Sequence, residues 1–95
     1  MNPIFLHRVR RNIDLAVAQA GKSPVRSVEE AWETPRTMNL DLFCAACLCP
    51  AESAALASFD GYPIGAAVCG NEEHQAIVLS AMRERGEVLR VGPLQ

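Results

Sequence analysis

Aromatic and imidazole side chains are scarce in this chain. Its 95 residues include three Phe, one Trp, one Tyr and two His. So few aromatic residues leave few large anchors for a core, and His7 and His74 are the only imidazoles for acid–base chemistry. No Ser-His-Asp pattern, glycine-rich phosphate loop or paired-carboxylate motif stands out. These absences predict a small core and a protein that is not an enzyme.

The sequence also lacks an excess of positive charge and a long hydrophobic run. The formal net charge is -2, and the apolar stretch 42–51 is shorter than the ~20 residues that cross a bilayer. The apolar residues 3–6 precede the first arginines, which reverses the order of a secretory signal. We therefore expect a cytoplasmic protein, where clustered cysteines more often bind metal than form disulfides.

Residues 1–21 predict an amphipathic helix. Pro3 suits the first turn of a helix and Gly21 suits its end. The apolar stripe either packs on the rest of the domain or forms an interface with a partner or with a second copy in a homodimer. The residues of this stripe recur at helical spacing: Phe5, Val9, Ile13, Ala16, Val17 and Ala20.

Basic residues gather in the same segment. Arg8, Arg10 and Arg11 stand beside His7. Such a run is most often a solvated helix face. It is also the place where this acidic chain would contact nucleic acid, so a nucleic-acid-binding regulator is one alternative function.

Residues 22–37 predict a connector between the N-terminal helix and a second unit at residues 38–91. Prolines bracket this connector, and Ser27 is placed to cap one short helix that runs through Trp32. Residues 38–42 then alternate apolar and polar side chains, which is the period of a half-buried strand. All of these segments are expected to form a single domain, 1–95.

A β-hairpin is expected after the first cysteines. Residues 50–56 fit either a helix opened by Pro50 or the first arm of a hairpin. The Asp60-Gly61 pair favours the hairpin, because this dipeptide suits the tight turn between two strands. Residues 62–68 would return as an edge strand, since they contain Pro and Gly.

The clearest predicted helix follows the hairpin. Asn71 is suited to cap it, and its apolar stripe continues to Gly86. Residues 87–91 predict a short strand. The pair Gly92-Pro93 is expected to end the ordered chain.

Cysteine and histidine form the pattern C-x2-C, a spacer of 21 residues, then C-x4-H, made by Cys44, Cys47, Cys69 and His74. A C-x2-C turn lets two sulfurs face one ion, and three thiolates with one imidazole suit zinc. Cys49 is an alternative fourth ligand in place of His74. The cysteines also fit small buried hydrophobes or a redox pair. We favour one structural zinc ion, whose four protein ligands leave no open position for catalysis.

The order of these parts resembles the treble-clef group of zinc fingers. A C-x2-C knuckle, a hairpin with an Asp-Gly turn, and a Cys and a His at a helix start follow one another over residues 43–85. The resemblance implies an α+β fold in which the knuckle, the hairpin and the C-terminal helix surround one zinc ion. Leu48 stands where the group usually has Gly.

A second resemblance is to heavy-metal-associated domains. Residues 40–47, followed by Glu52 and Leu56, are similar to the strand, C-x2-C loop and first helix of that family. The resemblance implies a copper(I) carrier that binds its ion on Cys44 and Cys47. This alternative requires a helix after the second cysteine.

These patterns lead to one functional hypothesis. The chain is expected to be a non-enzymatic, zinc-stabilised binding module that acts as a protein-interaction adaptor or inhibitor, of the kind found among accessory proteins of bacteria and phages. Because the net charge is negative, a protein is the expected partner rather than nucleic acid. No membrane partner is expected.

Overall fold

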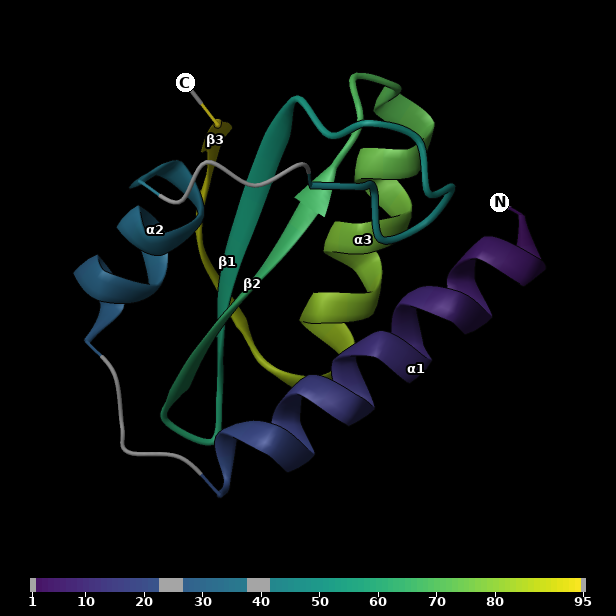
Figure 1. The fold of residues 1–95 in the computed structure, drawn as a ribbon. Coiled ribbons are helices and arrows are strands. Elements are labelled where there is room, and N and C mark those ends of the chain that lie inside the picture. The colour runs from purple at the N-terminus through teal and green to yellow at the C-terminus, as the bar shows by residue number, and fades with distance from the viewer. Residues whose placement is uncertain (1, 23–26, 38–41, 95) are drawn as a thin grey trace.

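The computed structural model describes residues 2–22, 27–37 and 42–94. These residues form an α+β fold, as the sequence predicts, in which helices cover both faces of an antiparallel sheet (Figure 1). The strand order of the sheet is β2-β1-β3. The elements, in chain order, are α1 (Pro3–Ala20), α2 (Val28–Thr37), β1 (Ser53–Phe59), β2 (Tyr62–Val68), α3 (Glu72–Arg85) and β3 (Glu87–Pro93).

The predicted hairpin is confirmed. Strands β1 and β2 pair in antiparallel register from Ser53 opposite Val68 to Phe59 opposite Tyr62. The turn between them places Asp60 at φ 52° and Gly61 at φ 86°, the left-handed conformation that an Asp-Gly pair accepts at low cost. Strand β2 is an edge strand, as its Pro and Gly predict.

The sequence underestimates the last strand. Strand β3 runs through Gly92 and Pro93, so the expectation that this pair ends the ordered chain is wrong. Pro93 lies opposite Ser53 on β1, and the next residue, Leu94, donates its backbone N–H to the carbonyl of Glu52 at 3.1 Å. Because β3 is a sheet edge, a proline is tolerated there.

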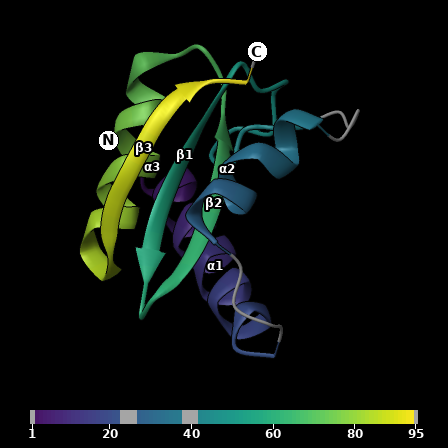
Figure 2. The ribbon, with the colours of Figure 1, turned by 90° about the vertical axis from the view of Figure 1, so that its left-hand side faces the viewer.

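The central strand β1 is buried on both faces, and its side chains point alternately to one face and the other. Ala55 and Ala57 belong to the main core, whereas Leu56 lies opposite Arg90, whose side chain contacts α2. Figure 2 shows the sheet between α3 and α2, which cover opposite faces. The fully buried side chains of the main core come from α1, α3, the sheet and the first cysteine, and they include Val9, Ile77, Val78, Met82 and Cys44.

Helix α1 packs along α3 under the sheet. Asn2 caps the helix through its side-chain oxygen, 2.9 Å from the backbone nitrogen of Ile4. Val9 and Ile13 are buried in the core, so this part of the predicted stripe covers the domain itself, the first of the two arrangements that the sequence allows.

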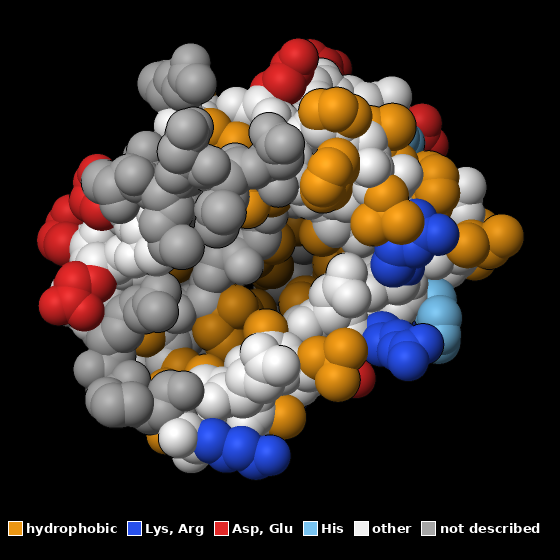
Figure 3. All heavy atoms as spheres, viewed as in Figure 1, with side chains coloured by type: hydrophobic (Ala, Val, Ile, Leu, Met, Phe, Trp, Pro, Cys, Tyr) orange, Lys and Arg blue, Asp and Glu red, His pale blue; other side chains and the backbone are white. Residues whose placement is uncertain are grey.

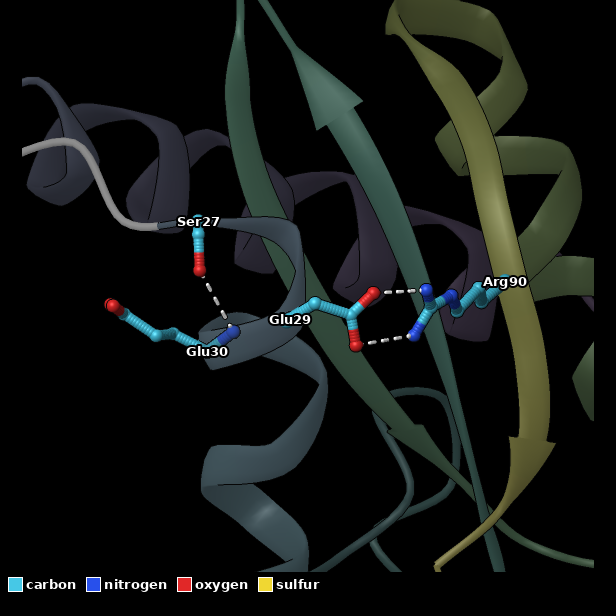
Figure 4. A network of polar contacts seen from close by, with 4 residues as sticks. All are labelled: Ser27, Glu29, Glu30 and Arg90. Atoms are coloured by element: carbon cyan, nitrogen blue, oxygen red, sulfur yellow. Dashed lines mark hydrogen bonds and ion pairs between the residues drawn. The ribbon is translucent and has the colours of Figure 1, made fainter.

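Helix α2 is longer than the short helix expected in the connector. Ser27 accepts a hydrogen bond from the backbone N–H of Glu30 at 3.1 Å, which is the predicted cap. Glu29 forms a two-pronged ion pair with Arg90 of β3 (Figure 4), and the Arg90 guanidinium lies 5.7 Å from the Trp32 ring centre. Trp32 therefore anchors the connector, although through a cation–π contact as well as packing.

Two further expectations fall on the segment around the first cysteines. The strand expected at 38–42 lies almost wholly outside the described residues, and Phe43 forms an isolated β-bridge with Pro50. The helix that a heavy-metal-associated domain requires after the C-x2-C loop is absent, because residues 53–59 form β1. The layout that the heavy-metal-associated resemblance implies is therefore wrong.

None of the described helices combines the length and the apolar character needed to span a membrane.

Candidate metal centre

The C-x2-C segment forms a tight turn. The backbone N–H of Leu48 donates to the carbonyl of Cys44 at 3.0 Å, and the N–H of Cys44 donates to the carbonyl of Cys49 at 2.7 Å. Leu48 adopts φ 65°, the left-handed conformation for which glycine is favoured. The knuckle thus forms with Leu48 in the position where the treble-clef group usually has Gly.

Backbone hydrogen bonds hold this knuckle against the end of the hairpin. The N–H of Ala45 donates to the carbonyl of Ala67 at 2.9 Å, and the N–H of Glu52 donates to the carbonyl of Val68 at 2.9 Å. Both acceptors belong to the last residues of β2. The chain leaving β2 therefore reaches Cys69 beside the knuckle.

The start of α3 positions the other two residues. Asn71 caps the helix by accepting from the backbone N–H groups of Glu73 and His74, as the sequence predicts. This cap fixes His74 in the first turn. The side-chain amide of Gln75 donates to the carbonyl of Cys69 at 3.2 Å and so ties the loop to the helix.

These elements bring four candidate ligand atoms together, which we call the Cys3His cluster: Cys44, Cys47, Cys69 and His74. The four atoms lie within 4.8 Å of one another. The Cys47 and Cys69 sulfurs are 3.7 Å apart, and the Cys69 sulfur lies 3.2 Å from Nδ1 of His74. Zinc–sulfur bonds of ~2.3 Å at tetrahedral angles separate two sulfurs by ~3.8 Å, so the donor set fits such an ion.

The same distances speak against a disulfide. A sulfur–sulfur bond is ~2.05 Å long, far shorter than the 3.7 Å between Cys47 and Cys69. All four cysteines of the chain are free thiols. No disulfide therefore joins any two of these cysteines in this structure.

Cys49 lies outside the cluster. Its side chain is exposed and donates a hydrogen bond to Cys47, which is the main reason that its pKa is raised above the ordinary value. Among the described residues, the group that can hold a cation contains His74 and not Cys49. Which residue is the fourth ligand of a bound ion stays a prediction, and the geometry favours His74.

Burial and backbone amides act on the two buried thiols in opposite directions. Burial raises the pKa of Cys44, but the backbone N–H groups of Cys47, Cys69 and Ala46 face its sulfur and bring the pKa below the ordinary value. The N–H of Ala46 lies 3.4 Å from that sulfur. Burial is the main cause that raises the pKa of Cys69 to about 11. A metal ion at the cluster would need both groups as thiolates.

Two residues of α1, Phe5 and Arg8, lie against the cluster or its knuckle, a role that the sequence did not indicate for either; it placed Phe5 in the apolar stripe and Arg8 in the basic segment. Arg8 donates from Nη1 to the carbonyl of Ala46 at 2.6 Å. The ring of Phe5 meets the His74 ring edge to face, with centres 5.1 Å apart. No local motif identifies such contacts, because they join residues that are far apart in the sequence.

The three arginines of the basic segment have different surroundings. Arg8 contacts the knuckle, and Arg10 pairs with Glu84 of α3 at 2.7 Å. Arg11 is exposed. Two of the three cations thus already bind groups within the domain.

Comparisons with known proteins add no family to this geometry. No family model, no curated protein and no solved structure matches the chain. The case for a metal centre therefore depends on the Cys3His cluster itself.

Proposed function

We propose that this protein is a non-enzymatic binding module stabilised by one structural zinc ion. The observation that carries the proposal is the convergence of four donors from the two sides of the hairpin to within 4.8 Å. Three thiolates and an imidazole suit zinc, and four protein ligands leave no position for a catalytic water. Such a thiolate site suits a reducing compartment such as the cytoplasm.

The arrangement around the cluster supports a treble-clef-like unit. A knuckle, the β1–β2 hairpin and helix α3 follow in that order, with Cys69 and His74 at the helix start. Helices α1 and α2 and strand β3 are additions to this unit. A zinc ion would join the knuckle to α3 and so hold the hairpin between them.

A protein partner is favoured by the surface around the knuckle. Figure 3 shows hydrophobic side chains gathered over the knuckle segment and the N-terminal part of α1, with Lys and Arg side chains beside them along α1. Phe43, Leu48 and Ile4 are 56%, 58% and 67% exposed. Large apolar side chains that cluster in the open are typical of protein-binding surfaces. An adaptor or inhibitor would use this face.

Site-specific photo-crosslinking in cells tests this proposal. A photoreactive residue placed at Leu48 is expected to yield a discrete protein adduct, whereas the same residue at Arg83, an exposed position in the last turn of α3, is not. The adduct should disappear when Cys44→Ser prevents metal binding. Identical adducts from both positions, or none from either, would contradict a protein-binding role for this face.

The nucleic-acid alternative has less support, because Arg8 and Arg10 are engaged within the domain. Its test is binding to a generic DNA duplex at rising salt. A regulator of this kind would bind at ~50 mM salt and lose most of its affinity by ~200 mM. We expect no binding at either concentration.

A further inference from the structure

One turn of α1 reaches both halves of the Cys3His cluster. The Arg8 guanidinium donates to the carbonyl of Ala46 inside the knuckle at 2.6 Å. It also lies 5.7 Å from the centre of the Phe5 ring, and Phe5 contacts the ring of His74. Arg8 and Phe5 thus connect α1 to the ligands on the knuckle and to the ligand on α3.

The residue that Arg8 holds also donates a hydrogen bond to a cluster sulfur. Arg8 binds the carbonyl of Ala46, and the backbone nitrogen of the same Ala46 lies 3.4 Å from the sulfur of Cys44, to which its N–H donates. A side chain that fixes the carbonyl restricts the motion of Ala46 and so keeps its N–H directed at the sulfur. Arg8 therefore acts on Cys44 without touching it.

The Arg8 cation would offset the negative charge of a metal-bound cluster. Zinc with three thiolates and one neutral imidazole carries a net charge of about −1. Cys44 is fully buried and Cys69 is 8% exposed, so water solvates that charge poorly. Arg8 is a partly buried cation in contact with the knuckle, and opposite charges attract more strongly where water is excluded.

We propose that Arg8 is a positioning residue that raises the affinity of the Cys3His cluster for its metal ion, by holding Ala46 so that its N–H donates to the Cys44 thiolate. The inference builds on the proposed structural zinc ion. It also assigns α1 a role beyond packing, because metal binding and the docking of α1 must then stabilise each other.

Competition with a chromophoric zinc chelator tests the proposal on the full chain. Arg8→Met, which keeps most of the aliphatic side chain, is expected to weaken zinc binding by about 10-fold, a loss typical for outer contacts of a metal site. Arg10→Met is the matched control. It removes a cation from the same helix and breaks the Glu84 ion pair between α1 and α3. Because that pair is exposed, it contributes little to the docking of α1, and Arg10 does not contact the knuckle, so the zinc affinity should stay close to that of the wild type.

Cobalt(II) substitution separates a direct effect on the sulfur from a change in folding. Weakening of the hydrogen bond from the Ala46 N–H leaves the Cys44 thiolate richer in electron density, so the thiolate-to-cobalt charge-transfer band of Arg8→Met should move to longer wavelength. Arg8→Lys keeps the charge and should restore most of the zinc affinity. Equal zinc affinities for Arg8→Met and Arg10→Met, or an unmoved band, would overturn the role of Arg8. A wild-type protein that binds neither ion would instead refute the proposed zinc site.

Discussion

Removal of the metal is expected to cost this small domain a large part of its stability. A bound ion would cross-link the knuckle to the start of α3 across a spacer of 21 residues between Cys47 and Cys69. In the chain-entropy account, a cross-link that closes a loop of this length stabilises the folded state by roughly 3 kcal/mol, and removal of the ion loses that free energy of unfolding. For a domain of this size, that loss lowers the melting temperature by about 10–25 °C.

Thermal unfolding followed by circular dichroism provides the assay, with and without a strong chelator and with a thiol reductant present throughout. Metal analysis of the same samples must show that the chelator has stripped the protein. The melting temperature should recover when zinc is added back, and the recovery should increase with free zinc. A stripped protein that melts at the temperature of the untreated protein would refute the cross-linking role.

Two further predictions test the packing and the surroundings of the cluster. Gly86→Ala should destabilise the domain by about 1–3 kcal/mol in a denaturant titration, because its Cβ would lie 2.2 Å from the carbonyl oxygen of Ser58. Gly21→Ala is the control, since its Cβ would have ordinary contacts at 3.7 Å. Equal stabilities of the two variants would contradict the packing at Gly86. In the zinc-loaded protein, an alkylating reagent should modify Cys49 alone, since it is the exposed thiol; mass spectrometry that finds buried Cys44 modified as fast would contradict this.

Short-range signals predicted most of the fold. The Asp60-Gly61 turn, the Asn71 cap and the periodic stripe of α1 are local features, and each marks its element in the structure. The extent of β3 was underestimated, because a Gly-Pro pair usually ends a strand and its tolerance here depends on an edge position beside β1. Position in a sheet is a long-range property that no window of sequence contains.

The candidate site was likewise predicted where it depends on local spacing and missed where it depends on the folded backbone or on long-range contacts. Spacing alone selected the four members of the Cys3His cluster, which the structure brings together. It did not exclude Cys49, because a turn that directs one cysteine inward and another outward depends on the left-handed backbone at Leu48. The contact of Arg8 with the knuckle joins residues 38 positions apart, and the sequence indicated only a basic helix face or a contact with nucleic acid.

Metal analysis of protein purified under reducing conditions, without added metal, tests the central claim most directly. The account predicts one zinc ion per chain in the wild type and in Cys49→Ser, and loss of zinc in Cys44→Ser and His74→Ala. A wild-type protein that is folded and free of metal would contradict the zinc-stabilised module. Retention of zinc in His74→Ala, together with its loss in Cys49→Ser, would contradict the ligand set.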